Sequence, residues 1–238
     1  MSSKVKQSIR ERIWDLMERE GIASFPRPVH GRIPNFEGAE TAAAQLAELD
    51  AFKRARVVKV NPDAPQHLVR EKALMGGKRL LMPTPRLRKG FIMLEPEIPR
   101  SKFRYASTIR GSFVWGKPVG LKALPKVDLV VVGSVAVSPN GARLGKGGGY
   151  SEMEYAILRQ LGLIDEKIPV ATTVHDAQIV DDEVPLEAHD LMVDVIVTPT
   201  RTLVTGSRAP KPSGILWDEV TEEMKEEMPI LRSLEPGI

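Results

Sequence analysis

The spacing of hydrophobic residues changes repeatedly between helical and extended along the chain. Apolar residues recur every three or four positions from Val5 to Met17, which predicts a helix over 4–20. Further helices are expected over 39–49, 66–75 and 150–161. Short aliphatic runs predict strands at 57–60, 79–82, 91–94, 128–132, 168–174 and 194–198. The run at 128–132 is continuously aliphatic, which suits a strand buried on both faces. Because strands alternate with helices, we expect an α/β fold with a largely parallel sheet.

The last part of the chain has a different character. Residues 205–213 (TGSRAPKPS) read as a linker, and the acidic segment 217–228 as a terminal helix that either docks or frays. We therefore divide the chain into an α/β domain over residues 1–204 and a linker with a C-terminal helical tail over residues 205–238.

Composition narrows the classes of function. The chain has 238 residues, of which 42% are hydrophobic, and its formal net charge is +3. This charge is too small to argue for nucleic acid without a focused basic patch. The absence of cysteine excludes disulfides, thiolate metal sites and a cysteine nucleophile. The charged N-terminal segment has no apolar core of a secretory signal, and no apolar run reaches the ~20 residues of a membrane span. We expect a cytoplasmic protein.

The glycine-rich segment after the clearest strand carries the strongest chemical signal. Gly145, Gly147, Gly148 and Gly149 lie between the strand at 128–132 and the helix expected from Tyr150. Such glycines let backbone amides approach an anion, and the helix start adds free N–H groups and a positive dipole end. Arg143 and Lys146 add two positive charges, so the segment predicts a phosphate site. Neither a P-loop nor a dinucleotide-binding fingerprint fits its spacing.

The segment RLGKGGGY at 143–150 resembles the RLGxGxGYYDR signature of 5-formyltetrahydrofolate cyclo-ligases. Other segments agree in the same order: Lys6-x-x-Ile9-Arg10, Gly77-Lys78-Arg79 with Pro83, Met93, Gln178, and the closing pattern from Pro185 through Glu187, His189-Asp190 and Asp194 to Thr198-Pro199. The resemblance covers residues 4 to about 200. The segments 33–39 and 82–91 resemble the divergent branch called methenyltetrahydrofolate synthase domain-containing proteins.

The resemblance implies a fold, a reaction and a set of binding residues. The fold would be a three-layer, cyclo-ligase-like sandwich (NagB/RpiA/CoA transferase-like), and the reaction the MgATP-dependent closure of 5-formyltetrahydrofolate to 5,10-methenyltetrahydrofolate. Arg143 and Lys146 would be the catalytic residues, and Glu152 would help to hold Mg²⁺. The implied ATP-binding residues are Lys6, Arg10, Arg143, Gly145, Lys146, Gly147, Gly148, Gly149 and Tyr150. The implied residues for the reduced folate are Asp63, Met93, Tyr150, His175 and Gln178.

The chain departs from the family pattern around the expected pterin pocket. Ser151-Glu152-Met153 stands where the signature has Tyr-Asp-Arg, and Asp63 is one methylene shorter than the family's glutamate. A related formyl-pterin is therefore an alternative substrate. A non-catalytic nucleotide-binding protein, or an RNA-binding one using the basic tracts 86–89 and 100–110, is an alternative function, although solvated loops are the default reading of those tracts. The four histidines (His30, His67, His175 and His189) lack metal-binding spacing, and we expect no structural metal.

Overall fold

The computed structural model of the chain describes residues 2–207 and 209–236. The α-helices are α1 (Ser2–Arg19), α2 (Ala39–Glu48), α3 (Asp50–Arg54), α4 (His67–Met75), α5 (Phe103–Ala106), α6 (Ile109–Trp115), α7 (Tyr150–Gln160) and α8 (Glu222–Glu227). The strands are β1 (Ala23–Ser24), β2 (Asn35–Phe36), β3 (Val57–Val60), β4 (Arg79–Pro83), β5 (Phe91–Leu94), β6 (Lys117–Val119), β7 (Leu129–Val132), β8 (Ala136–Val137), β9 (Arg143–Leu144), β10 (Val170–Thr173), β11 (Val195–Val197) and β12 (Thr202–Val204). Short 3₁₀ helices lie between them, among them η2 (Pro85–Leu87), η5 (Asp176–Gln178), η6 (Trp217–Glu219) and η7 (Pro229–Ser233).

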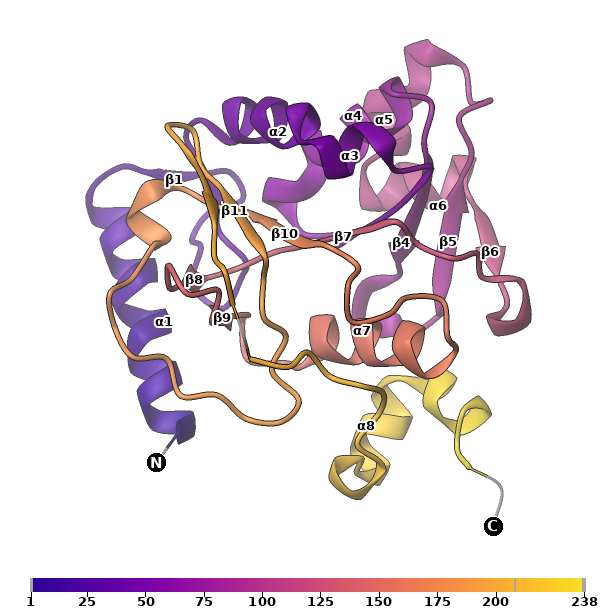
Figure 1. Ribbon diagram of the computed structural model, residues 1–238. Coiled ribbons are helices and arrows are strands. Elements are labelled where there is room, and N and C mark those ends of the chain that lie inside the picture. Colours follow the sequence, from indigo (N-terminus) through magenta and orange to yellow (C-terminus); the bar gives the residue numbers. More distant parts are fainter. Residues whose placement is uncertain (1, 208, 237–238) are drawn as a thin grey trace.

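One eight-stranded sheet forms the centre of the molecule (Figure 1), with the order β12-β11-β10-β7-β3-β4-β5-β6. The five strands from β11 to β4 pair in parallel, whereas β12, β5 and β6 are joined by antiparallel pairings. The expectation of a largely parallel sheet is therefore confirmed. From β3 the chain continues through α4 to β4 on one side, and from β7 through α7 to β10 on the other. The order of the strands thus reverses between β3 and β7, where α/β proteins place their binding crevices.

Side chains of successive strand residues enter two different cores. Val58 and Val60 of β3 belong to a cluster with α2, α3, α4 and α5, while Val57 belongs to a cluster with α7. In β7, Leu129 and Val131 join the first cluster, and Val130 and Val132 join the second. Figure 1 shows α2 to α5 above the sheet and α7 below it. This alternation follows from the two-residue period of a strand, and it produces the predicted three-layer sandwich.

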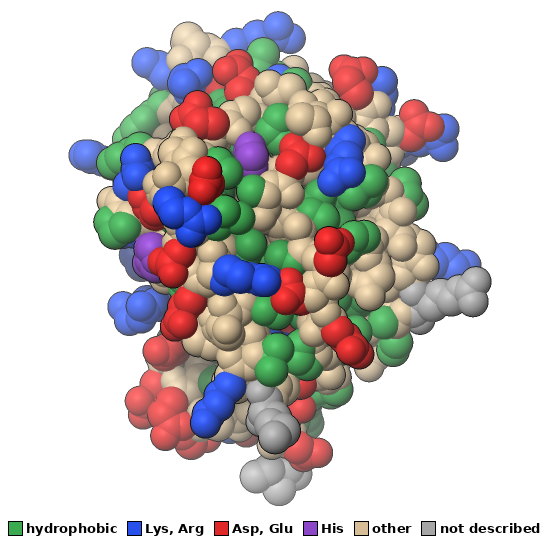
Figure 2. Space-filling model, turned by 90° about the vertical axis from the view of Figure 1, so that its left-hand side faces the viewer, with side chains coloured by type: hydrophobic (Ala, Val, Ile, Leu, Met, Phe, Trp, Pro, Cys, Tyr) green, Lys and Arg blue, Asp and Glu red, His purple; other side chains and the backbone are tan. Residues whose placement is uncertain are grey.

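Helix α1 packs beside the sandwich on a third apolar cluster. Ile9, Ile13, Trp14 and Met17, which share one helix face, meet residues of β2, β8 and β9. The opposite face of α1 is polar, and basic and acidic side chains are interspersed on this side of the molecule (Figure 2). On this side of the molecule, positive and negative side chains therefore alternate, and neither sign of charge dominates.

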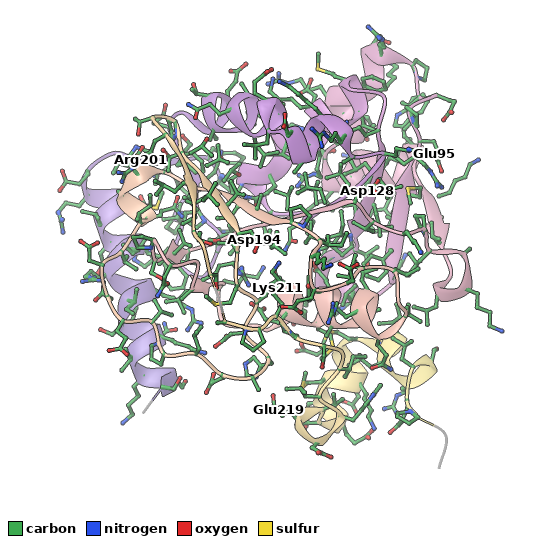
Figure 3. All side chains as sticks on the ribbon, viewed as in Figure 1. Glu95, Asp128, Asp194, Arg201, Lys211 and Glu219 are labelled. Atoms are coloured by element: carbon green, nitrogen blue, oxygen red, sulfur yellow. The ribbon has the colours of Figure 1, made fainter. Side chains whose placement is uncertain are left out.

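The C-terminal segment packs under α7. Met228 and Leu231 are buried in the α7 cluster, and Lys211 forms an ion pair with Asp194 at 2.6 Å, both labelled in Figure 3. Glu219, also labelled there, accepts a hydrogen bond from His189 at 2.8 Å. The expected helix over 217–228 is split into η6 and α8. The boundary at residue 204 stays a prediction.

The basic tract 100–110, expected to be solvated loop, folds into short helices instead. Phe103 and Ala106 are buried three residues apart against the α4 face, which stabilises α5. The basic side chains Arg100, Lys102 and Arg104 point away from the core and are exposed. Across the described residues, none of the helices is long and apolar enough to cross a membrane.

Candidate active site

A cavity of about 800 Å³ lies beside the carboxyl ends of β3 and β4, on the side of the strand-order reversal. Residues 61–64 after β3, residues 85–86 after β4 and residues 143–152 around the glycine loop line it. Helix α1 contributes Lys6 and Arg10, and the segment 187–190 completes the wall. The volume is within the range of roughly 300–1,000 Å³ that small-molecule sites occupy.

The loop Gly145–Gly149 joins β9 to α7 and exposes its backbone to this cavity. Gly147 has φ of +100° and Gly149 has φ of +64°, a left-handed region that residues with a Cβ avoid. Gly149 is the residue before the first turn of α7, and that helix has 11 residues. The unpaired N–H groups of the first turn and the positive end of the helix dipole therefore face the cavity. This arrangement favours binding of an anion.

Two cations reach the glycine loop. Lys146 is 42% exposed, and its Nζ lies 3.9 Å from Asp63 Oδ1, too far for a tight hydrogen bond. Arg10 Nε donates to the carbonyl oxygen of Gly145 at 2.7 Å, which attaches α1 to the loop. Burial lowers the pKa of Arg10, although the nearby Glu152 opposes this effect. Lys146 is thus the cation with the weakest internal contacts in the loop, and it remains available to an anionic ligand.

Two nitrogens of the Arg143 guanidinium are engaged within the protein, while its buried Nε has no partner among the described residues. Arg143 is 2% exposed, and its guanidinium binds the carbonyl of Gly133 and the carboxylate of Glu152. Burial of Glu152 works against its charge, but the charge of Arg143 and its hydrogen bond hold the pKa of Glu152 below the ordinary value. The pair links the end of β7 to the start of α7. Both side chains therefore face the cavity as a neutralised ion pair.

Lys6 of α1 lines the cavity and is paired with two carboxylates. Its Nζ is 2.6 Å from Asp190 and 2.7 Å from Glu187. Although burial opposes the charge, hydrogen bonds to Asp190 and Glu187 raise the pKa of Lys6. Glu187, His189 and Asp190 bring ligand atoms within 4.8 Å of one another, the spacing of a metal site. The ammonium of Lys6 already occupies the two carboxylates, so the cluster anchors α1 to the 187–190 segment.

The sequence is matched over residues 2–199 by the model of the 5-formyltetrahydrofolate cyclo-ligase family. The chain belongs to this family. It is 53% identical over 233 residues to the methenyltetrahydrofolate synthase domain-containing protein of Bos taurus, which covers 96% of this chain and 61% of that protein. The Homo sapiens protein of the same name is 49% identical, with the same coverage. The chain thus spans about three fifths of the length of these curated relatives.

The fold also matches a solved structure of the family. The NMR structure of 5,10-methenyltetrahydrofolate synthetase from Aquifex aeolicus superposes with a TM-score of 0.53 and 19% identity, covering 86% of this chain and 95% of the other. At this identity the likeness concerns the fold alone. The expectation of a cyclo-ligase-like fold is confirmed.

The cyclo-ligase pattern assigns residues to ATP and to folate, and the cavity is lined by the whole first group but by only part of the second. All nine residues implied for ATP line the cavity, and so do Glu152 and Asp63. Met93 instead lies in the core of β5, 3% exposed. His175 caps η5 and accepts a hydrogen bond from the Ala177 amide at 3.1 Å. Gln178 is buried and donates to the carbonyls of Ser134 and Val135. Met93, His175 and Gln178 thus lie outside the cavity lining, and their role toward folate stays a prediction.

A buried polar network beneath the cavity was missed from the sequence. Lys59 of β3 is fully buried, and its Nζ binds the carboxylate of Glu154 on α7 and, at 2.6 Å, the side chain of Asn61. Asn61 also donates to Ser151 Oγ at 2.7 Å. Burial raises the pKa of Glu154, which the positive charge of Lys59 counteracts. A lysine inside the aliphatic run VVKV was the available signal, because a buried lysine requires a partner.

Arg70 is a second missed residue, and it fixes the loop that carries Asp63. Its guanidinium binds the carbonyl oxygens of Asn61, Asp63 (3.0 Å) and Ser107 (2.7 Å). Complete burial lowers the pKa of Arg70 to about 10. The clamp joins the end of β3 to the segment before α6, so Arg70 positions one wall of the cavity.

Proposed function

We propose that the chain catalyses the ATP-dependent closure of 5-formyltetrahydrofolate, or of a related formyl-pterin, to 5,10-methenyltetrahydrofolate. The observation that carries the proposal is the glycine loop at the start of α7, with Lys146 and Arg10 beside it, inside the cavity at the strand-order reversal. Family membership supports the reaction, and the amides and cations of the glycine loop support binding of a triphosphate there.

The proposed chemistry needs positioning and charge neutralisation more than a protein nucleophile. The formyl oxygen attacks the γ-phosphorus of ATP, the bond to the β-phosphate oxygen breaks, and ADP leaves. N10 of the folate then attacks the activated formyl carbon, the carbon–oxygen bond breaks, phosphate leaves, and N10 loses its proton. Backbone amides of the loop and the ammonium of Lys146 would stabilise the charge on the transferred phosphoryl group. Arg10 would hold the loop in place through Gly145.

Magnesium is the expected companion of ATP. Glu152 faces the cavity and has a lowered pKa, so it is ionised as a ligand must be, but one of its oxygens already binds Arg143. Asp63 lines the same cavity, and its carboxylate forms a long ion pair of 3.9 Å with Lys146. Mg²⁺ usually takes one or two carboxylates together with phosphate oxygens. These residues therefore fit a metal that arrives with the nucleotide and neutralises charge on its phosphates.

The test follows the near-ultraviolet absorbance of the methenyl product with 5-formyltetrahydrofolate, Mg²⁺ and ATP. Turnover should require ATP and should fall roughly 100-fold in Lys146→Ala, the size of effect seen when one transition-state donor is removed. Lys122→Ala removes a charge that is also exposed, from η4 outside the cavity, and serves as the control. Equal activity of the two variants would reject the role given to Lys146, and ATP-independent or absent turnover would reject the proposed function.

A further inference from the structure

Arg86 lines the cavity from the loop that follows β4, and its backbone is strained. Arg86 has φ of +56° and Leu87 has φ of +52°, and they are the only non-glycine residues with positive φ in the part of the chain that the structure describes. The left-handed conformation is unfavourable for residues with a Cβ. Two consecutive residues with this conformation indicate that the surrounding structure holds the backbone of this loop in place.

The packing around the loop explains how the conformation is held. Leu87 is fully buried in the α7 cluster, together with Met228 and Leu231 of the C-terminal segment. Thr84 Oγ1 donates to the Gly90 carbonyl at 2.9 Å and accepts from the Lys89 amide at 3.0 Å. Ile230 lies so close to Gly90 that an added Cβ would be 3.2 Å from its methyl group. Strain that is fixed from several sides is typical of functional sites.

Arg86 lines the cavity, and its guanidinium is not held by a carboxylate of the described residues. Within the described residues, no ion pair joins Arg86 to a carboxylate, in contrast to Lys6 and Arg143. Burial and the hydrogen bond to Glu227 raise the pKa of Tyr150, and the charges of Arg86 and Arg88 oppose this rise, which places both near the start of α7. Of these two arginines, Arg86 lines the cavity.

We propose that Arg86 is an additional anion-binding residue of the cavity and contacts a phosphate group of the bound nucleotide. The inference rests on the proposed function, because it requires a nucleotide in the cavity. Because Arg86 lies near the first turn of α7, we expect it to bind the phosphates of the nucleotide and not the carboxylates of a folate. A guanidinium binds phosphate oxygens through two parallel donors, which a lysine at this position would not do.

Calorimetric titration of ATP in the absence of folate tests the contact. Arg86→Ala should weaken ATP binding about tenfold or more, the effect of losing a charge-assisted hydrogen bond. Arg88→Ala removes the same charge from the same loop, outside the cavity lining, and should change the affinity less than threefold by the same scale. Equal affinities of the two variants would overturn the inference. If the wild-type protein binds no ATP, the proposed function fails with it, whereas normal wild-type binding with an unaffected Arg86→Ala rejects the Arg86 contact alone.

A second pair of variants separates ligand binding from folding. Arg86→Gly removes the guanidinium and also relieves the left-handed strain, whereas Arg86→Ala removes only the guanidinium. Both should bind ATP equally weakly, and Arg86→Gly should melt about 2 °C or more above Arg86→Ala. If 5-formyltetrahydrofolate binding without ATP falls in both variants while ATP binding is unchanged, Arg86 serves the folate carboxylates and the phosphate assignment is wrong.

Discussion

The basic residues of the cavity look alike in the sequence but differ in what they contact. Lys6 is neutralised by Glu187 and Asp190, and Arg143 by Glu152. The guanidinium of Arg70 donates its hydrogen bonds to backbone carbonyls. Among the described residues, the carboxylate paired with Lys146 is that of Asp63, 3.9 Å away. The first three therefore position the walls of the site, and the charge offered to a ligand comes mainly from Lys146, with Arg86 as the additional cation that we propose.

The anchoring of α1 through Lys6 should depend on pH. The hydrogen bond from Lys6 lowers the pKa of Glu187 below its ordinary 4.5, so in that range the folded protein binds fewer protons than the unfolded chain. The contribution of the Lys6–Glu187 pair to stability is fully present at pH values above the pKa of Glu187 in the unfolded chain. It is lost as the pH falls through the lower pKa of Glu187 in the folded protein. Between about pH 6 and pH 3 the wild type should lose more thermal stability than Lys6→Met. Parallel losses in the two proteins would contradict the assigned ion pair.

Arg70→Lys should damage the cavity although it keeps the charge. A lysine cannot bind three carbonyls at once, so the loop with Asp63 loses its clamp and a buried cation loses partners. We expect roughly 2–3 kcal/mol of lost stability and a higher KM for the formyl substrate. Denaturant unfolding and steady-state kinetics measure both. A stable variant with unchanged KM would show that Arg70 does not position Asp63.

At the scale of elements, the helix that begins at the glycine loop is supported from both sides. Helix α7 lies between the sheet and the C-terminal segment, which appears in yellow below it in Figure 1. Tyr150, its first residue, donates a hydrogen bond to Glu227 of α8. The family model ends at residue 199, whereas the alignment with the Bos taurus relative covers 96% of the chain and so includes most of the later segment. The C-terminal segment is thus a shared feature of these relatives and supports the loop from below.

Removing one anchor of this segment should destabilise the protein. Leu231 is fully buried under α7, so Leu231→Ala should cost roughly 2–5 kcal/mol of the free energy of unfolding. Leu186→Ala truncates a leucine that is 46% exposed and should change stability by less than about 0.5 kcal/mol. Urea unfolding of both variants compares the two sites. Similar small losses would mean that the segment does not stabilise the domain.

The elements that could be predicted are those with strong local signals. The aliphatic runs at 57–60 and 128–132 gave strands, and the apolar spacing from Val5 to Met17 gave α1. Strands β6 and β12 were missed because they are short, exposed edges without an aliphatic run. Strands β8 and β9, which pair with each other, were missed because each contributes only two residues to the pairing.

At the scale of the whole molecule, the site is made by chain segments that are distant in sequence. The glycine loop was predictable because its glycines and cations are neighbours in the chain. The roles of Arg70 and Arg86 were not predictable. Arg70 binds carbonyls that the fold brings to it, and the backbone of Arg86 is held because the neighbouring Leu87 packs in one cluster with Leu231. The parallel sheet brings these segments together by placing the carboxyl ends of β3 and β4 at one edge.

The measurement that tests the account most directly follows the formyl oxygen. Turnover of 5-formyltetrahydrofolate carrying ¹⁸O in its formyl group, with Mg²⁺ and unlabelled ATP, should transfer the label to inorganic phosphate, because that oxygen attacks the γ-phosphorus and leaves with it. Mass spectrometry of the released phosphate reads the result, and the amount of labelled phosphate should equal the amount of methenyl product. Methenyl product formed with unlabelled phosphate, or ATP hydrolysis without product, would contradict the phosphorylated intermediate and the function proposed for this cavity.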